Sequence, residues 1–135
     1  STLERIRATG PQRVLEIGCG LGLLLFPLAE NCSDYWATDF SEHALDYVRD
    51  RLAGTPLATK IRLLDAREAI DFDGIPRAAF DVVVINSVIQ YFPDLPYLLE
   101  VLGKAIDAVR PGGSLFLGDV RNLALLEAYH ASVQA

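Results

Sequence analysis

The sequence predicts an α/β fold, in which helices cover both faces of an open and mainly parallel β-sheet. Short apolar runs alternate with amphipathic runs along the chain of 135 residues, as expected when strands alternate with crossover helices. The run FDVVVI, residues 80–85, is apolar enough for a strand that is buried on both faces. The stretch VLEIGCGLG, residues 14–22, has the pattern of a strand that ends in a glycine-rich loop. No repeat or linker is visible, so residues 1–135 are expected to form one domain.

The expected elements follow one another as β-α units. Strands are expected at residues 13–17, 35–38, 60–64, 80–85 and 114–118. Helices are expected at residues 21–31, 41–52, 95–109 and 123–132, with a short helix at residues 2–8 before the first strand. The irregular stretch 71–80 is expected to be a surface loop.

Three of the expected helices carry signals at their ends or inside them. Ser41 is a typical N-cap for the helix that follows it. Pro111, in the sequence RPGG, cannot continue the helix at residues 95–109, and the glycines after it permit a turn into the fifth strand. Pro27 lies inside the expected helix at residues 21–31, where it would remove a backbone hydrogen bond unless the first turn is irregular, so we expect a bend there.

Composition and charge exclude some classes of partner. The chain is 51% hydrophobic and 22% charged, which is enough apolar material for a packed core. Twelve basic and 18 acidic residues give a formal net charge of −6, which argues against a nucleic-acid duplex or an anionic membrane as the main partner. A small ligand or another protein is favoured instead.

The cysteines and the apolar runs indicate a cytoplasmic protein. Only Cys19 and Cys32 occur, without the spacing of a metal site or a disulfide framework, so no metal is expected. No apolar run reaches the roughly 18 residues that a membrane span needs, and no export signal is visible.

The glycine-rich loop lies where such sheets bind ligands, beyond the carboxyl ends of the strands. Gly18, Gly20 and Gly22 permit positive φ angles and leave room for a ligand to approach the backbone. Taken alone, the loop is equally well explained as a tight turn without a ligand.

Two carboxylates narrow the class of ligand. Asp39 closes the second expected strand about 20 residues after the loop, where a carboxylate can accept both hydrogen bonds of a ribose diol. Leu23 stands where the third glycine of a dinucleotide-binding GxGxxG motif would fall, and a negative Glu16 would repel a pyrophosphate. A cationic ligand that contains adenosine is therefore favoured over a dinucleotide.

The stretches LEIGCGLG and TDFS, at residues 15–22 and 38–41, resemble the first two motifs of class I S-adenosylmethionine-dependent methyltransferases. The resemblance implies a Rossmann-like three-layer sandwich with strand order 3-2-1-4-5. It also implies that Gly18 and Gly20 pass under the methionine portion of S-adenosylmethionine, with Glu16 and Cys19 beside them, and that Asp39 holds the ribose hydroxyls.

The same resemblance implies the rest of the cofactor site. Phe40 would lie beside the adenine, and Asp65 and Ala66 would meet its amino group and ring edge. Asn86 and Ser87 would face the methionine tail and the reacting methyl group.

These residues also have purely structural interpretations. Asp39 can cap the helix that begins near Ser41, Asp65 can be a solvated turn carboxylate, and Asn86 can satisfy loop amides. Cys19 is more simply a small packing residue than a nucleophile, because no histidine or cation is near it in the sequence.

A narrower resemblance covers residues 11–134. The segments YWATDFSEHALDYVR, NSVIQYFPDLPYLLEVLGKAIDAVRPGG, GDVRN and YHASVQ are similar to methyltransferase domains embedded in nonribosomal peptide synthetases and hybrid polyketide synthases. Those domains methylate an intermediate that a carrier protein holds as a thioester, commonly at an aminoacyl nitrogen.

On this resemblance the acceptor would be surrounded by Gln90, Tyr91, Asp119, Arg121 and His130. Tyr91 and His130 are the catalytic candidates: His130 can act as a base because its usual pKa is near neutrality, or it can be an ordinary surface residue. Tyr91 and Phe92 can contact a sulfonium through their ring faces, or they can pack the loop.

The chain departs from the family at its C-terminal side. The family sheet usually has seven strands, and the last two are not visible here, so a C-terminally truncated fragment is expected. The fifth strand, SLFLG, would then have an unpaired apolar edge through which the protein could self-associate.

The function predicted from the sequence is methyl transfer from S-adenosylmethionine to an acceptor tethered to a carrier protein. Three alternatives stay open: a free-standing methyltransferase for a small molecule, a cofactor-binding module without activity, and a nicotinamide-dependent oxidoreductase, which Leu23 and Glu16 disfavour.

Overall fold

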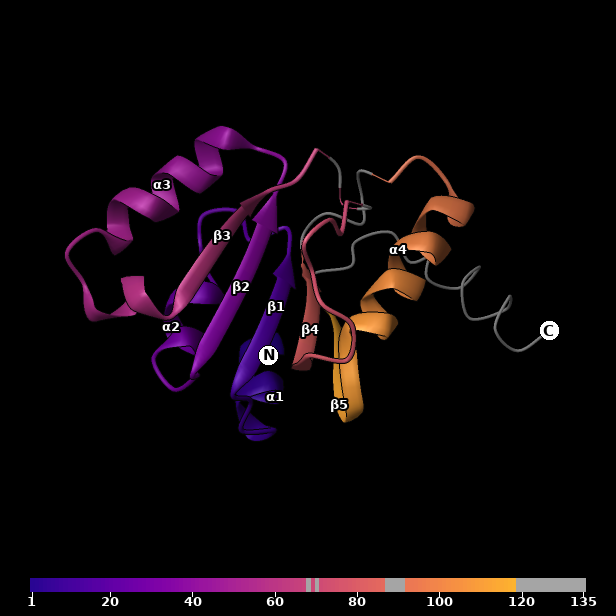
Figure 1. Ribbon diagram of the computed structural model, residues 1–135, viewed down its shortest axis with the longest axis horizontal. Coiled ribbons are helices and arrows are strands. Elements are labelled where there is room, and N and C mark those ends of the chain that lie inside the picture. The colour runs from indigo at the N-terminus through magenta and orange to yellow at the C-terminus, as the bar shows by residue number, and fades with distance from the viewer. Residues whose placement is uncertain (68, 70, 87–91, 119–135) are drawn as a thin grey trace.

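The computed structural model describes residues 1–67, 69, 71–86 and 92–118 of the chain. It contains a five-stranded parallel sheet in the order β3-β2-β1-β4-β5, which confirms the predicted fold class and strand order (Figure 1). The strands are β1 (Arg13–Ile17), β2 (Asp34–Asp39), β3 (Ile61–Asp65), β4 (Phe80–Asn86) and β5 (Val109–Gly118). The helices are α1 (Thr2–Ala8), α2 (Leu25–Ala29), α3 (Glu42–Leu52) and α4 (Leu95–Ala108), with a 3-10 turn η1 (Pro56–Thr59) before β3. The helix expected at residues 123–132 lies outside the described residues.

The sheet lies between two apolar layers, as a three-layer sandwich requires. On one face, α1, α2 and α3 contribute a core that includes Ile6, Leu25 and Val48, packed with side chains of β1, β2 and β4. On the other face, α4 packs Leu98 and Val101 against β1 and β4. Figure 1 shows α4 beside β4 and β5, far from α3 at the opposite edge of the sheet. Strand order changes direction between β1 and β4, so the carboxyl end of β1 is the switch point at which such sheets bind ligands.

Helix α2 is shorter than the sequence pattern predicts. The expected helix at residues 21–31 is helical only over Leu25–Ala29, after a turn at the end of the glycine-rich loop. Pro27 therefore lies in the first turn, where its missing N–H would have no partner within the helix. In place of the bend predicted at Pro27, the helix is shorter and begins so late that Pro27 falls in its first turn.

Strand β5 begins earlier than expected, directly after α4. Val109 and Ser114 pair with Phe80 and Val82, so residues 110–113 bulge opposite the single residue Asp81. A Cβ on Gly113 would lie 2.6 Å from the carbonyl oxygen of Asp81, which explains why a glycine is needed there. The turn predicted from RPGG is thus a bulge within the strand.

The connection from β3 to β4 is irregular, as predicted for residues 71–80. It is fastened to the end of α4, because the N–H groups of Ala78 and Ala79 donate to the carbonyls of Asp107 and Ala108 over 2.7 and 3.0 Å. Within the described part of the chain, β5 pairs only with β4. Self-association through its other edge stays a prediction.

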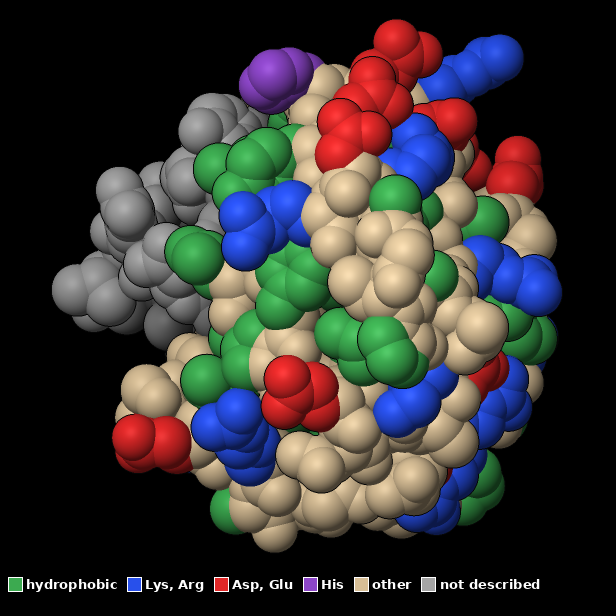
Figure 2. All heavy atoms as spheres, turned by 90° about the vertical axis from the view of Figure 1, so that its left-hand side faces the viewer, with side chains coloured by type: hydrophobic (Ala, Val, Ile, Leu, Met, Phe, Trp, Pro, Cys, Tyr) green, Lys and Arg blue, Asp and Glu red, His purple; other side chains and the backbone are tan. Residues whose placement is uncertain are grey.

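The surface carries charges of both signs. Figure 2 looks onto the side of the molecule formed by β3 and α3, and it shows acidic and basic side chains interspersed rather than a continuous basic surface. Among the described residues, no helix combines the length and apolar character that crossing a membrane requires.

Candidate cofactor site

Backbone hydrogen bonds connect the residues at the carboxyl ends of β1, β2 and β3. The N–H groups of Gly18 and Cys19 donate to the carbonyl of Thr38 over 2.9 and 3.1 Å. The N–H group of Ala66 donates to the carbonyl of Asp39 over 3.1 Å. These bonds bring together residues from three separate segments at the carboxyl end of the strands. The sequence assigned these residues to the cofactor.

The glycines of the loop serve different purposes. Gly18, Gly20 and Gly22 all have positive φ, at 81°, 54° and 88°. A Cβ on Gly22 would lie 2.4 Å from the ring of Phe26, so this glycine is required by packing inside the protein. A Cβ on Gly20 would meet no atom of the described residues within 4 Å, so nothing in this part of the chain covers the backbone of Gly20. Gly20 is therefore the position at which a ligand can approach the backbone.

Leu23 does not take the role of a third close-packed glycine. Its side chain is 83% exposed, and the tight contact in the loop is made one residue earlier, at Gly22. The sequence argument against a dinucleotide motif therefore agrees with the geometry of the loop.

Asp39 connects the loop after β1 to the start of α3. One carboxyl oxygen, Oδ2, accepts a hydrogen bond of 2.9 Å from the N–H of Gly20, and the other, Oδ1, accepts one of 2.9 Å from the N–H of Ser41. The N-cap of α3 is Ser41 itself, whose hydroxyl accepts from the N–H of Ala44 at 3.2 Å. Because an ionised carboxylate has about four acceptor sites, Asp39 retains one on each oxygen. It can hold the loop and bind a diol at the same time.

A pocket too narrow to hold a water molecule lies beside Asp39. It is lined by Ile17, Gly18, Thr38, Asp39, Phe40, Ala66 and Ala69. Phe40 is 51% exposed, which leaves its ring available to a flat apolar group. Ala69 was missed by the sequence analysis, because a single alanine in an irregular loop carries no signal of its position.

Asp65 is the last residue of β3 and pairs in register with Asp39. Its side chain is exposed, and it does not line the pocket in the described structure. Its contact with the adenine stays a prediction.

Glu16 is completely buried, two residues before the glycine-rich loop. Its Oε1 accepts a hydrogen bond of 2.7 Å from the hydroxyl of Tyr35, whereas Oε2 has no hydrogen-bond partner among the described residues. Burial raises the pKa of Glu16 to about 7, with the charge of Asp39 acting in the same direction and the Tyr35 hydroxyl and the Asn86 amide opposing it. The negative charge that the sequence predicts at Glu16 is therefore only partly present at neutral pH.

Asn86 ends β4 next to β1, near enough to Glu16 for its amide to lower the pKa of that carboxyl group. Cys19 is 3% exposed in the apolar core, and burial raises the pKa of its thiol, as do the nearby Glu16 and Asp39. This environment favours the packing interpretation of Cys19 over a nucleophilic one.

The remaining predicted residues divide into two groups. Ser87, Gln90, Tyr91, Asp119, Arg121 and His130 lie outside the described residues. Phe92 is described, and its ring packs against Tyr97 at 4.9 Å between centroids, which agrees with the interpretation that it packs the loop. Within the described ranges, no group of three or more His, Cys, Asp or Glu side chains is placed to hold a metal ion.

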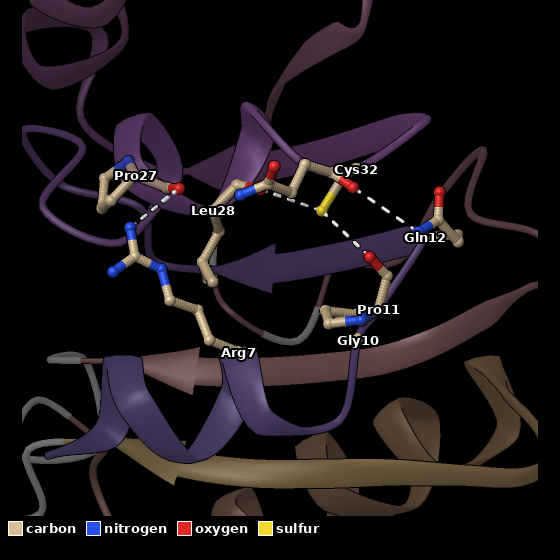
Figure 3. Close-up of a pocket in the computed structure, with 8 residues that line it drawn as sticks. Arg7, Gly10, Pro11, Gln12, Pro27, Leu28 and Cys32 are labelled. Carbon is tan, nitrogen blue, oxygen red and sulfur yellow. Dashed lines mark hydrogen bonds between the residues drawn. The ribbon is translucent and has the colours of Figure 1, made fainter.

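A larger hollow, of about 250 Å³, lies at the opposite end of the sheet, next to the residues that precede β1 and β2 (Figure 3). Its polar groups already pair with one another: Arg7 donates to the carbonyl of Pro27 at 3.3 Å, and the Cys32 thiol lies 3.1 Å from the carbonyl of Leu28 and 3.4 Å from that of Pro11. The residues that line this hollow include no residue of the glycine-rich loop and no carboxylate. The narrow pocket beside Asp39 includes Gly18 of that loop and the Asp39 carboxylate, so its residues, rather than its volume, make it the better candidate site for an adenosine.

Comparison with known proteins agrees with this geometry. Residues 15–115 match the family model described as a methyltransferase domain. The chain is 53% identical over 134 residues to chondramide synthase cmdD of Chondromyces crocatus, covering 99% of this chain and 3% of that protein. It is 48% identical over 136 residues to a probable non-canonical nonribosomal peptide synthetase, CymA, of Salinispora arenicola, covering 99% of this chain and 2% of that protein. The chain thus spans only a small part of these relatives.

Solved structures share the fold. The glycopeptide N-methyltransferase MtfA matches with a TM-score of 0.72 and 27% identity, over 86% of this chain and 50% of that one. The CcbJ methyltransferase of Streptomyces caelestis matches with a TM-score of 0.74 and 21% identity, over 86% of this chain and 50% of that one. With the family model covering most of the sheet and the glycine-rich loop, the chain belongs to the methyltransferase domain family, and the enzyme class predicted from its sequence is confirmed.

Proposed function

We propose that the domain binds S-adenosylmethionine at the carboxyl end of the sheet and transfers its methyl group to an acceptor held on a carrier protein. The observation that carries the first half is the bond between Asp39 and the N–H of Gly20, at 2.9 Å, beside a backbone position that faces open space. The residues fit the group: Asp39 has acceptor sites left for a ribose diol, and the orphaned, buried Oε2 of Glu16 suits a cationic tail.

Each part of the cofactor has residues suited to hold it. Asp39 would accept hydrogen bonds from the ribose hydroxyls, and the exposed ring of Phe40 would cover the adenine, with Asp65 and Ala66 at its edge. The loop backbone at Gly18, Cys19 and Gly20 would lie against the methionine portion.

Glu16, Asn86 and Ser87 would surround the amino-acid tail and the methyl group. The bound cofactor supplies an already activated methyl group, so the main task left to the protein is to align the acceptor and, where needed, to take its proton. The candidates for that task stay Tyr91 and His130, with Gln90, Asp119 and Arg121 near the acceptor.

The proposal of a tethered acceptor rests on the relatives. The 48% identical CymA is a probable nonribosomal peptide synthetase by its name, and further relatives at 36–38% identity are also nonribosomal peptide synthetases. Because this chain covers only 2–5% of those proteins, we infer that it acts as one domain of a larger assembly. An aminoacyl or acyl thioester on a neighbouring carrier domain would then be the acceptor.

The cofactor half is tested by calorimetric titration with S-adenosylhomocysteine. We expect Asp39→Ala to weaken binding by about 1–3 kcal/mol, because the ribose hydroxyls lose their acceptor. Asp46→Ala, which changes an exposed carboxylate on α3, is the matched control and should leave the Kd unchanged. Equal affinity of Asp39→Ala and the unchanged protein, with both folded by circular dichroism, would refute the site.

The acceptor half is tested by mass spectrometry after incubation with S-adenosylmethionine. An aminoacyl group is offered either as a thioester on a carrier protein or as the free amino acid. Methylation of the thioester alone supports the proposal, whereas methylation of the free amino acid favours a free-standing enzyme. Cofactor binding without methylation of either would favour a module that binds without activity.

A further inference from the structure

We propose that Tyr35 is a positioning residue for the cofactor: its hydroxyl holds Glu16 so that the second carboxyl oxygen stays available to a cationic group, and cofactor binding then expels a proton from this carboxyl. The inference rests on the proposed function, since it concerns the same site. Tyr35 carried no signal in the sequence, where it is simply one residue of an apolar strand.

The geometry of the pair is set by the register of β1 and β2. Tyr35 pairs with Val14, and Glu16 pairs with Ala37, so Tyr35 and Glu16 are diagonal neighbours on one face of the sheet. The ring of Tyr35 is fully buried in the core formed with α1, α2 and α3. A buried phenol needs a hydrogen-bond partner, and the Tyr35 hydroxyl donates to Glu16 Oε1 at 2.7 Å.

This hydrogen bond leaves the carboxyl group half satisfied. Oε1 accepts from Tyr35, and the Asn86 amide lies near enough to favour the ionised carboxyl, but no donor among the described residues is in hydrogen-bonding geometry with Oε2. A buried acceptor without a partner is destabilising, and native structures rarely keep one without a reason. The unpaired oxygen is therefore a second observation, independent of the glycine-rich loop, that points to a ligand.

The groups that face Glu16 supply no positive charge. They are Tyr35 and Asp39 from β2, Cys19 from the loop after β1, and the neutral amide of Asn86 from β4. The helix α2, on the same face, contributes apolar side chains to the core around the pair. None of the salt bridges among the described residues involves Glu16. The missing counter-ion is what a cationic cofactor would bring.

The proton balance follows from these surroundings. Because burial raises the pKa of Glu16 to about 7, about half of the molecules carry a proton on this carboxyl at pH 7. Burial and the neighbouring Glu16 raise the pKa of Tyr35 well above its usual value, so the phenol keeps its proton. When a cation binds, the O–H bond of the Glu16 carboxyl breaks and the proton goes to solvent. The resulting carboxylate pairs with the cation and still accepts the hydrogen bond from Tyr35.

Two consequences can be measured. Affinity should fall roughly tenfold between pH 8 and pH 6, because binding must remove a proton that the carboxyl increasingly holds. The Tyr35→Phe variant removes a hydrogen bond that stabilises the ionised carboxyl, so the midpoint of this pH dependence should move upward. The loss of affinity should consequently be larger at pH 7 than at pH 8.

The test is calorimetry with S-adenosylhomocysteine between pH 6 and pH 8, in buffers with different ionisation enthalpies, which counts released protons. We expect about half a proton released at pH 7 by the unchanged protein and none from the carboxyl in Glu16→Gln, whose affinity should be weaker and nearly independent of pH. Tyr47→Phe removes the hydroxyl of a partly exposed tyrosine on α3 and is the control that should change nothing.

The outcomes separate the two proposals. Absence of binding by the unchanged protein would overturn both the cofactor site and the role of Tyr35. Binding with equal proton release by the unchanged protein and Glu16→Gln would overturn only the inference about the proton. A pH profile of Tyr35→Phe that coincides with that of the unchanged protein would overturn the positioning role of Tyr35. An upward shift in Tyr35→Phe, absent from Tyr47→Phe, supports it.

Discussion

Asp81 and Glu16 are carboxylic acids on neighbouring strands, at opposite ends of the sheet, and they differ in how fully their carboxyl oxygens are hydrogen-bonded. At the amino end, Asp81 Oδ2 accepts from the N–H groups of Gln12 and Arg13 over 2.6 and 2.9 Å, and Oδ1 accepts from Arg110 over 2.6 Å. At the carboxyl end, Glu16 Oε1 accepts from Tyr35 and the Asn86 amide also favours the ionised carboxyl, but Oε2 has no donor in hydrogen-bonding geometry among the described residues.

The pKa values of the two groups move in opposite directions as a result. Burial opposes ionisation of Asp81, but the hydrogen bonds from Arg110, Arg13 and Gln12 outweigh it and lower the pKa. For Glu16, burial prevails and raises the pKa to about 7. At the amino end, the polar partners of Asp81 all come from the protein itself, whereas at the carboxyl end we propose that a ligand supplies the partner that Glu16 Oε2 lacks among the described residues.

The largest expected effect is on folding stability and comes from Glu16→Gln. The native state holds the Glu16 proton up to about pH 7, whereas the unfolded chain loses it near pH 4.5, so folding becomes less favourable as pH rises between these values. We expect Glu16→Gln to raise the free energy of unfolding by roughly 3 kcal/mol at pH 8 and hardly at all at pH 4.5. Urea denaturation at both pH values measures it. A gain that is equal at both would contradict the account.

Asp81→Ala should act in the opposite direction. It leaves two backbone N–H groups and Arg110 without their acceptor, so we expect a loss of about 2 kcal/mol in the free energy of unfolding at neutral pH. Because the pKa of Asp81 is lowered, its contribution should be present above the usual pKa of an aspartate and disappear as pH falls below it. The exposed Asp107, 3.6 Å from Arg77, is the control, and Asp107→Ala should cost far less. Equal losses would remove the contrast between the two ends.

Substitutions of Gly22 and Gly20 in the loop should affect different properties: the first mainly lowers folding stability, and the second mainly weakens ligand binding. Gly22→Ala would push a Cβ to 2.4 Å from the Phe26 ring, so we expect it to lower stability by about 2 kcal/mol. Gly20→Ala meets open space and should cost only about 1 kcal/mol for its positive φ, while weakening S-adenosylhomocysteine binding at least tenfold. Thermal denaturation and calorimetry on both variants test this. Full binding by Gly20→Ala would move the ligand away from the loop.

The smallest expected effect comes from Ser41→Ala, which distinguishes the N-cap of α3 from the candidate binding residue Asp39. Ser41→Ala removes the side-chain acceptor at the N-terminus of α3 and should cost about 1 kcal/mol of stability. Since Asp39 keeps its bond to the Ser41 backbone, we expect the Kd for S-adenosylhomocysteine to change less than twofold. A binding loss in Ser41→Ala as large as that in Asp39→Ala would mean that Asp39 acts mainly by holding the helix.

The sequence was sufficient for features that depend on local pattern. Apolar runs predict the strands, and the ends of those runs predict that Gly18, Gly20 and Asp39 lie at the carboxyl end of the sheet, while their contact with a ligand stays a prediction. Pro27 predicts a bend in a helix over residues 21–31, whereas α2 begins only at Leu25, after a loop in which Gly22 lies close to the ring of Phe26.

Features that depend on contacts between strands were beyond sequence reasoning. Tyr35 meets Glu16 only because β1 and β2 pair in one particular register. The state of Glu16 also could not be predicted, since its charge is set by burial and by the polar groups around it. The early start of β5 follows similarly from the fit of Gly113 against Asp81.

We propose that the ligand binds at the carboxyl end of the sheet, where Glu16 Oε2 lacks a partner among the described residues. Nuclear magnetic resonance of the ¹⁵N-labelled domain, titrated with S-adenosylhomocysteine, tests it directly, because backbone amides report from both ends at once. We predict large shifts at Gly18, Gly20 and Ala66, and none at Gly10 and Cys32 around the hollow of Figure 3. Shifts confined to Gly10 and Cys32 would contradict the account.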